Sequence, residues 1–584
     1  MSEKNIAGQE NHVQEEHAHL AEQTEHETKP SRLMIPVAIV LLLILVGYGY
    51  LVYQGVPQNW TKVANTPHHE EQHGDHAASA EHAEQHETVP AAPTDDQNVK
   101  HHPPYYMVIP FAALLLCIAV LPLVPAAEHF WESNTNKFMI AAVLGALTLL
   151  YYYCLCDFNI DRHFPGHSVI TPEQGGFAIV SAIFINAIVN EFFPFIVLLF
   201  SLFTITGGIR IAGNLQASPF VNSVILFVGG VLASVIGTTG AAMLLIRLLL
   251  ETNQERQHKA HTVIMFIFVV CNCGGCLTPL GDPPLFLGYL RGVAFTWTFF
   301  ALWPAWMFTN LILIGFYFLW DTAWFYRREP LLNKVTDKEQ TTTLQISGWR
   351  LNVPLLIGVV AAVALLDPGK PVPGTDWHPW YYLREAAQLG LAALSLLFGS
   401  YQIRKANVFN FVAIGEVAAL FFGIFICMQA PLQILNYEGR NIVHHAEQTT
   451  GLSKERLFFW STGALSSVLD NAPTYVVFYE TAKSLSPNTE EELKLSPEWQ
   501  KEYEKGNMVK VGNNGFVDYF LLMAVSLGAV FMGSMTYIGN GPNFMVKAIA
   551  EQNGVRMPSF FGYMVYSVLI LLPLFITVTL VFLH

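Results

Sequence analysis

Long hydrophobic runs separated by short polar segments dominate the chain from Leu33 to the C-terminus. Several runs are about 20 residues long, the length that an α-helix needs to cross a bilayer. The pattern predicts an all-α, multi-pass membrane protein of the inner (plasma) membrane. The first run, residues 33–53, follows Lys29, Arg32 and a long polar tail without a small-residue cleavage site. We therefore expect a transmembrane anchor there and not a signal peptide.

Two segments near the N-terminus lack this hydrophobic pattern. Residues 1–32 and 54–104 are rich in Glu, His, Gln and Ala, and we expect an acidic, His-rich disordered tail and a disordered linker. Closely spaced histidines in the linker suggest transition-metal binding or proton buffering, and a solvated tether is the alternative. The metal-ligand candidates are His68, His69, His73 and His76.

Composition narrows the class of protein further. The chain is 52% hydrophobic and 13% charged, and its net charge of −14 lies largely in the polar tails, which argues against binding to nucleic acid. All seven cysteines lie in or beside hydrophobic segments, so they do not form a secreted disulfide framework. For the run Cys271, Cys273 and Cys276 we favour packing beside a broken helix, and a metal or redox site is the alternative.

The hydrophobic runs are interrupted at matched places. "LTPLGDPPLFLGYL" (277–290) puts Asp282 between Gly281 and two prolines, and "MTYIGNGPNFMVKA" (535–548) aligns with it without gaps. Each interruption is preceded by a second irregular spot, at 234–244 and 466–477, and farther upstream by one glutamate, Glu191 or Glu416. A repeated pattern of interrupted hydrophobic segments is typical of secondary transporters.

These matches divide the chain into two copies, residues 105–320 and 351–584, joined by a cytoplasmic loop at 321–350. Each copy is predicted to have five spans and a re-entrant hairpin, at 220–250 or 456–482, and five crossings invert the second copy. With the N-terminus inside, most Lys and Arg residues of the loops become cytoplasmic. The 483–515 insertion loop is the exception, because this topology places its lysines on the side opposite the cytoplasm.

Irregular backbone at membrane depth survives where it lines a polar cavity. We expect the hairpin tips and broken helices to meet at the midplane and to present oxygen atoms, which suit hard cations. Asp282, Asp470, Glu191 and Glu416 are the proton-coupling candidates, and structural ion pairing is the alternative for the two glutamates. The predicted ion- or substrate-binding residues are Thr238, Thr239, Thr278, Asp282, Asp470, Asn471, Thr474, Thr536, Asn540 and Asn543.

From about Tyr105 onward the chain resembles the ion transporter superfamily. The resemblance rests on "VLDNAPT" (468–474), "LTPLGDPPLFLGYLRG" (277–292) and "GTTGAAML" (237–244), together with the single glutamates. The superfamily includes citrate transporter-like proteins, arsenite permeases, dicarboxylate/sodium symporters and NhaD-type sodium/proton antiporters. The chain is most similar to the citrate transporter or sodium/proton antiporter branch, and the resemblance implies a homodimer. It departs from the Ser-Asn-Thr motifs of the dicarboxylate members.

Two close aspartates in a site of low dielectric constant favour retention of a proton on one of them. A cation that displaces this proton is exchanged for it, so we favour Na⁺(Li⁺)/H⁺ antiport. The alternative is a sodium- or proton-coupled citrate or dicarboxylate symporter whose anion binds at half-helix N-termini. Arsenite transport is a third option. A further alternative is a metal-handling membrane protein that acts through the His-rich arm.

The predicted spans contain no catalytic spacing such as His-Glu-x-x-His or Gly-x-Ser-x-Gly, so the chain is not expected to be an enzyme. We expect no cofactor other than Na⁺ or Li⁺ as the transported or coupling ion. The expected partners are a small inorganic ion or carboxylate and the lipid bilayer.

Overall fold

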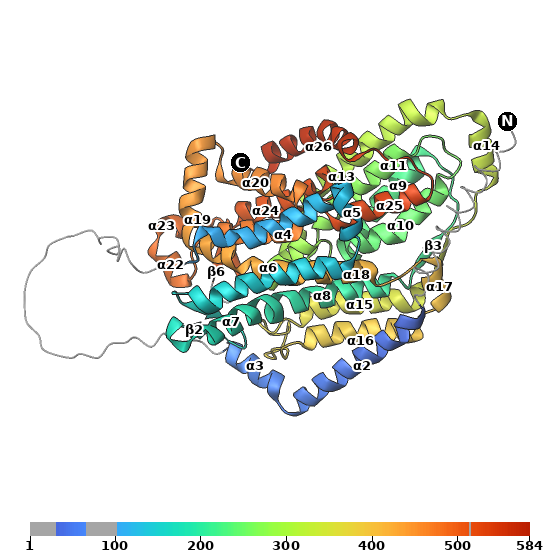
Figure 1. Ribbon diagram of the computed structural model, residues 1–584. Coiled ribbons are helices and arrows are strands. Elements are labelled where there is room, and N and C mark those ends of the chain that lie inside the picture. Colours follow the sequence, from blue (N-terminus) through green and yellow to red (C-terminus); the bar gives the residue numbers. More distant parts are fainter. Residues whose placement is uncertain (1–30, 66–101, 167, 513–514, 584) are drawn as a thin grey trace, which may run out of the picture.

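The computed structural model describes residues 31–65, 102–166, 168–512 and 515–583, which form a predominantly helical protein (Figure 1). Six described helices are long and apolar enough to span a membrane, and a bent helix pair, Val412–Cys427 with Gln429–Thr450, is a seventh candidate. The all-α polytopic class is therefore confirmed. Strands within the described residues form three antiparallel pairs: β1 (Ile160–Arg162) with β2 (Ser168–Ile170), β3 (Arg210–Ala212) with β4 (Gln345–Ser347), and β5 (Met508–Val511) with β6 (Gly515–Asp518).

The helices of residues 105–320 include two runs that are interrupted by short segments of a different helix type. A π-helical segment, η4, joins α7 to α8, and the short helix η5 (Cys273–Cys276) lies between α11 and α12. The elements are α4 (Ile109–Val120), α5 (Pro125–Trp131), α6 (Asn134–Leu155), α7 (Gly176–Phe184), η4 (Ile185–Phe192), α8 (Phe193–Thr206), α9 (Pro219–Ile236), α10 (Thr238–Thr252), α11 (Ala260–Val269), α12 (Pro283–Leu290) and α13 (Trp297–Trp320).

The helices of residues 351–584 also include interrupted runs. Helix α19 follows α18 after a bend of 43°, and the two together are long and apolar enough to form one bent span. The elements are α15 (Trp349–Leu365), α16 (Leu383–Phe398), α17 (Tyr401–Ala406), α18 (Val412–Cys427), α19 (Gln429–Thr450), α20 (Lys454–Val468), α21 (Asn471–Ser484), α24 (Tyr519–Met532), η8 (Gly533–Met535), α25 (Gly541–Gln552) and α26 (Phe560–Phe582).

The predicted anchor is present as α2 (Ser31–Tyr53), which packs against α8 and α16. The prediction that residues 54–104 form only a disordered linker is wrong for its first part, because Val56–Asn65 form the helix α3. Trp60 of α3 packs edge-on against Phe164, and Thr61 is buried. These contacts with distant loops stabilise α3. They could not be predicted from the polar composition of residues 54–104.

Two other predicted loops contain regular structure. In the 321–350 loop, the helix of α13 continues through η6 (Asp321–Phe325) and η7 (Tyr326–Arg328), and is followed by α14 (Leu331–Glu339) and β4. The 483–515 insertion contains α22 (Glu490–Leu495), α23 (Pro497–Glu504) and the β5–β6 hairpin. Both segments therefore fold, although neither is hydrophobic enough to suggest a span.

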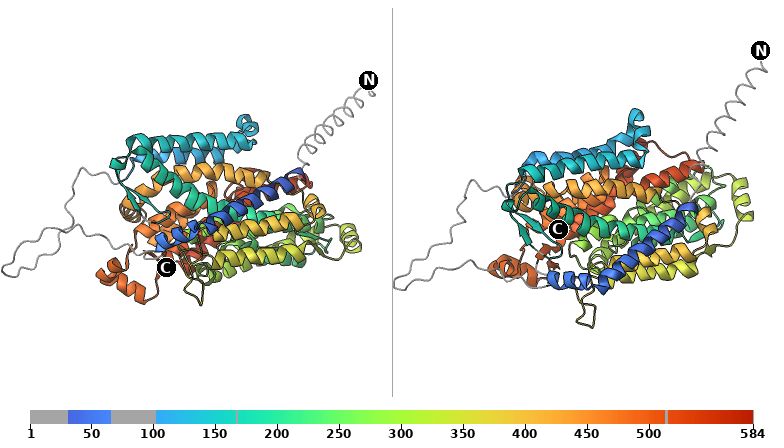
Figure 2. Two further views of the ribbon diagram at one scale, coloured as in Figure 1. Left: turned by 90° about the horizontal axis from the view of Figure 1, so that it is seen from below. Right: turned by 60° about the horizontal axis from the view of Figure 1, so that its bottom comes forward.

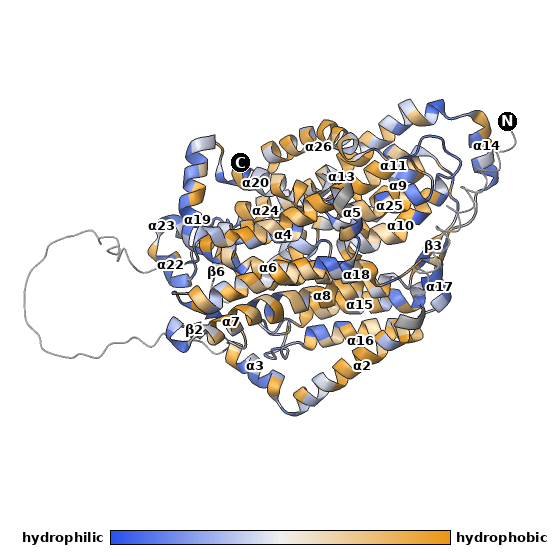
Figure 3. Cartoon of the chain, viewed as in Figure 1, coloured by the Kyte–Doolittle hydropathy of each residue, from blue (hydrophilic) through white to orange (hydrophobic). Residues whose placement is uncertain are grey.

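Polar segments gather at the two ends of the helical body. The loop helix α14 lies with α17 at one end, and α22 and α23 lie at the opposite end (Figures 1 and 2). Hydrophobic residues cover most of the long helices between them, whereas hydrophilic residues mark both ends (Figure 3). This is the distribution expected of a body that crosses a bilayer lengthwise. Which end faces the cytoplasm stays a prediction.

The helices pack in two groups. The long-helix group comprises α4, α6–α8, α15, α16 and α18, and the hairpin group comprises α9–α13, α20, α21 and α24–α26. Within the hairpin group, α10 packs on α25 and α12 packs on α21, so that elements of the two copies are interleaved. This interleaving brings together the segments in which the sequence pattern is interrupted.

A candidate ion-binding site between two hairpins and two broken helices

Helices α9 and α10 form the first hairpin, with Gly237 at its tip. Gly237 has a φ of +84°, a conformation that glycine adopts at low cost. At the other end of the hairpin, Asn222 and Asn253 exchange two hydrogen bonds of 2.8 Å. The backbone N–H of Thr238 donates to the carbonyl oxygen of Gly281 at 2.8 Å. The hairpin tip therefore lies directly against the first interrupted helix.

Helices α20 and α21 form the second hairpin. Their antiparallel packing is shown by the rings of Phe458 and Phe478, whose centroids lie 6.2 Å apart. Asp470 is the N-cap of α21, and its side chain accepts a hydrogen bond of 3.1 Å from the backbone N–H of Ala472. A side-chain acceptor at this position stabilises the first turn of a helix. Asp470 therefore has a local structural role at the hairpin tip.

Each hairpin is tied to one interrupted helix by a matched threonine. Thr278 donates from Oγ1 to the carbonyl oxygen of Ser234, and Thr536 donates to that of Ser467, each at 2.5 Å. Prolines stand in the first turn of α12 and of α25, where a missing N–H costs nothing. Thr278 and Thr536 therefore hold the tips in place, and their hydroxyl groups do not reach Asp282.

Asp282, the N-cap residue of α12, is the centre of the assembly. Its Oδ1 accepts hydrogen bonds from Thr238 Oγ1 at 2.9 Å and from Asn540 Nδ2 at 3.1 Å. Its Oδ2 accepts one from Asn471 Nδ2 at 2.6 Å. Thr238 and Asn471 each follow a hairpin tip, and Asn540 is the counterpart of Asp282 in the second copy. The structure thus brings together four of the predicted residues from all four interrupted segments.

An amide network lies behind Asp282. Asn540 also donates to the backbone oxygen of Cys271 at 3.0 Å and to Asn272 Oδ1 at 3.3 Å. Asn272 in turn donates to Asn543 Oδ1 at 2.8 Å. Asn543 is therefore linked to the site through Asn272. No sequence pattern indicates Asn272, because it lies within the cysteine run and the matched position of the second copy is not polar.

No cationic side chain among the described residues pairs with Asp282. The side chain is only 1% exposed, and none of the ion pairs seen among the described residues includes it. The helices α10, α12, α21 and α25 all begin at the site, and the partial positive charge of a helix N-terminus favours a negative group. A buried carboxylate without an ion-pair partner is expected to hold a proton or a metal cation.

Three other predicted residues lie at the edge of this cluster. Asp470 is half-buried and lies close enough to interact electrostatically with Asp282. Thr474 Oγ1 donates within its own helix, to the backbone oxygen of Asp470 at 3.0 Å. Thr239 is the second residue of α10 and is half-buried. Of these three, only Asp470 contributes charge near the central carboxylate.

Glu191 lies outside the Asp282 cluster. It stands on the π-helical segment η4, and its Oε1 accepts a hydrogen bond of 2.8 Å from Arg291. Arg291 follows α12 directly and also donates to Glu480 of α21 at 2.9 Å. Arg291 and Glu480 were missed in the sequence because neither interrupts the hydrophobic pattern. The pair between Arg291 and Glu191 connects the hairpin group to the long-helix group.

Glu416 is placed differently from its repeat counterpart. Its side chain is 43% exposed and accepts a hydrogen bond of 2.7 Å from Lys137, which is almost buried. Neither glutamate contacts Asp282, so the structure brings neither of these proton-coupling candidates to the central cluster. The alternative interpretation of both as paired charges agrees with these contacts.

The remaining candidates concern metals. His68, His69, His73 and His76 lie outside the described residues. Cys271, Cys273 and Cys276 are buried, and the part of the chain that the structure describes contains no group of His, Cys, Asp and Glu side chains suited to a metal ion.

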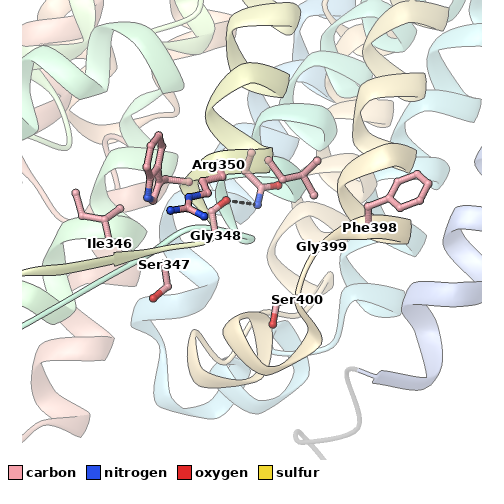
Figure 4. A pocket seen from close by; sticks show the side chains of 10 residues that line it. Ile346, Ser347, Gly348, Arg350, Phe398, Gly399 and Ser400 are labelled. Atoms are coloured by element: carbon pink, nitrogen blue, oxygen red, sulfur yellow. Dashed lines mark hydrogen bonds between the residues drawn. The ribbon is translucent and has the colours of Figure 1, made fainter.

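A surface pocket lies away from the predicted residues. It is formed where β4 leads into α15 and where α16 ends, and Asn352 donates there to the carbonyl oxygen of Gly348 at 2.9 Å (Figure 4). None of the predicted binding residues lines it. Its lining residues are Ile346, Ser347, Gly348, Trp349, Arg350, Leu351, Asn352, Phe398, Gly399 and Ser400.

Comparison with known proteins places the chain in a family. Residues 100–583 match the sequence profile of a family described as "putative citrate transport". No curated protein matches the chain. The match covers both helix groups and every residue of the Asp282 cluster, and it agrees with the resemblance found in the motifs. The chain therefore belongs to this citrate transport family and is a secondary transporter of the membrane.

Proposed function

We propose that the protein exchanges Na⁺ or Li⁺ for protons, and that both bind at Asp282. The observation that carries the proposal is a buried carboxylate whose three hydrogen-bond donors are all neutral. Since a buried charge requires compensation, a proton or a small cation completes the site. Only one of them fits at a time, and this competition couples their movements.

The oxygen atoms near Asp282 suit a small hard cation. Asn471 is completely buried, and its Oδ1 has no hydrogen-bond partner among the described residues. Thr238 offers a hydroxyl oxygen on the other side of the carboxylate. Carboxylate, amide and hydroxyl oxygens are preferred by hard cations, whereas thiolates suit softer metals. We propose that the Asp282, Asn471 and Thr238 side chains supply ligands to the transported ion.

The second candidate is a sodium- or proton-coupled citrate or dicarboxylate symporter. Two observations favour it: the description of the family, and the four helix N-termini that begin at the site. Helix N-termini bind anions readily. However, Asp282 already places a carboxylate there, so a substrate anion would be repelled until a cation had bound. In this second candidate, Asp282 holds the coupling ion.

Proton movement in inside-out vesicles separates the two candidates. A ΔpH-sensitive dye is followed while Na⁺, Li⁺, K⁺ or citrate is added, with wild-type protein, Asp282→Asn and the exposed control Glu490→Gln. We expect Na⁺ or Li⁺ to dissipate ΔpH in the wild type and in the control but not in Asp282→Asn. Sodium-dependent citrate uptake without any cation-driven proton movement would contradict the antiporter and support the symporter.

The His-rich arm is tested by substitution. Because α2 and α3 pack on the transporter body, removal of residues 1–104 would disturb the fold, and replacement of His68, His69, His73 and His76 by Gln is the cleaner change. Normal cation exchange in this variant is expected, and loss of exchange would favour a metal-handling role. The proposal includes a location in the plasma membrane, and it includes a homodimer, which the resemblance implies.

A further inference from the structure

The amide group of Asn540 is held in one orientation. Its Nδ2 lies within hydrogen-bond distance of three acceptors, the backbone oxygen of Cys271, Asn272 Oδ1 and Asp282 Oδ1, which share its two hydrogens. A carbonyl oxygen can only accept, so the contact with Cys271 identifies the nitrogen independently of the other two. If the amide turned over, its oxygen would face three acceptors. Asn540 therefore remains a donor to Asp282.

Asn272 supports this orientation from behind. It is completely buried, and its Nδ2 donates to the backbone oxygen of Ile267 and to Asn543 Oδ1, both at 2.8 Å. Asn543 is itself fixed, because its Nδ2 donates to the backbone oxygens of Gly533 at 2.9 Å and Thr536 at 3.0 Å. Both hydrogens of Asn272 are thus used, and its oxygen is left facing Asn540.

The other side of Asp282 has no such support. Asn471 Nδ2 donates to Asp282 Oδ2, and among the described residues no backbone carbonyl fixes its amide and nothing occupies its Oδ1. Six residues before Thr278 stands Asn272, whereas six residues before the matched Thr536 stands Val530, which cannot hydrogen-bond through its side chain. The network therefore exists on one side of the pseudo-symmetric site only.

We infer that Asn272 is a positioning residue that locks Asn540 as a donor to Asp282 and thereby excludes the Asn540 oxygen from the ligands of the cation, which are Asn471 and Thr238 beside the carboxylate. This inference rests on the proposed function. Asn471 can turn its oxygen toward a cation, because only its bond to Asp282 is lost. Asn540 cannot do so while Asn272 and the Cys271 carbonyl hold it. The site then binds one cation through Asn471 and Thr238 beside Asp282, and not through Asn540.

A double-mutant cycle in proteoliposomes tests the inference. Asn272→Val, Asn540→Ala and the double variant are compared for the half-saturating Na⁺ concentration and the maximal exchange rate. Because a hydrogen bond to a charged group is affected, each single variant is expected to raise half-saturation by about tenfold while the maximal rate stays within about twofold. Since Asn272 acts through Asn540, the double variant should show no further increase.

Additive effects in the double variant, or an unchanged half-saturation in Asn272→Val, would overturn the inference. If the valine variant does not fold, Asn272→Ser takes its place in the cycle, because serine keeps an acceptor toward Asn540. A smaller rise in the half-saturating Na⁺ concentration is then expected. Asp282→Asn is measured in parallel. Exchange that survives in Asp282→Asn refutes the proposed function itself, whereas exchange lost in Asp282→Asn with additive effects at Asn272 and Asn540 refutes only the positioning role.

Discussion

Two buried aspartates of the hairpin group have opposite surroundings. Asp282 is 1% exposed and Asp321 is fully buried. Asp321 accepts hydrogen bonds from Arg256 Nη1 at 2.8 Å and Nη2 at 2.5 Å, pairs with His261 Nε2 at 2.9 Å and accepts one from the hydroxyl of Tyr317 at 3.1 Å. The donors to Asp282 among the described residues are a hydroxyl and two amides.

The difference separates a structural carboxylate from one that is available to an ion. The charge of Asp321 is satisfied within the protein, and its pairs join the segment after α10 to the end of α13. Asp282 is held in place by neutral donors that leave its charge uncompensated. Burial alone therefore does not identify a transport site; the chemical nature of the partners does.

The largest expected effect is at Asp282. Asp282→Asn keeps the shape of the side chain but removes the charge that binds either a proton or a cation. We expect Na⁺-driven proton movement in vesicles to fall by at least about 100-fold, because a transport cycle without this charge has no coupling site. The amount of monodisperse protein after size-exclusion chromatography should be unchanged. Exchange at near wild-type rates would remove Asp282 from the mechanism.

Asp321→Asn should have the converse effect. It leaves the buried Arg256 without its bidentate partner, and breaking a buried ion pair in this way costs about 3–5 kcal/mol. We expect a clear drop in the thermal midpoint, measured by fluorescence-detected chromatography after heating. Protein that remains folded should retain the wild-type half-saturating Na⁺ concentration. An unaltered melting temperature would contradict the structural assignment of Asp321.

A smaller effect is expected at the single glutamates. Glu191→Gln weakens the buried contact with Arg291, which retains Glu480, and should slow exchange by about threefold and shift its pH profile, because the acceptor loses its charge while the guanidinium keeps its own. Glu416→Gln changes a half-exposed ion pair and should have almost no effect. The pH dependence of exchange in both variants tests this order. Identical, unshifted profiles would make both residues structural.

The smallest effect is expected in the 483–515 insertion. In this insertion, a hydrogen bond from Lys510 to the exposed Glu490 lowers the pKa of Glu490 below the ordinary 4.5. The associated stabilisation is therefore present above the pKa of the unfolded chain and is lost as the pH falls through the folded value. Lys510→Met should return the pKa of Glu490 toward 4.5 in an NMR titration of the full chain. Exchange near neutral pH should not change, and a changed rate would link the insertion to transport.

The interrupted segments could be predicted because they break local rules. Glycine, proline and a carboxylate inside a hydrophobic run indicate a functional or strained place, and their recurrence in two copies identified Thr238, Asp282, Asn471 and Asn540. The partnership of Asp282 with Asn471, 189 residues apart, followed only from the assumption that the two copies meet.

Other features could not be read from the sequence. Asn272 and Arg291 are single polar residues next to hydrophobic segments, and their importance depends on tertiary contacts with Asn540 and Glu191. The helix α3 is stabilised by loops that are distant in sequence. The opposite roles of Asp282 and Asp321 depend on which donors the fold places beside each carboxylate. Periodicity does not encode such contacts.

The central claim is that a cation and a proton compete for Asp282. The most direct test is the pH change when Na⁺ or Li⁺ is added to purified protein in a weakly buffered detergent solution, with K⁺ as the control. We predict proton release by the wild type and by folded Asp321→Asn, and none by Asp282→Asn. Release that persists in Asp282→Asn, or Na⁺ binding by the wild type without any release, would contradict the claim.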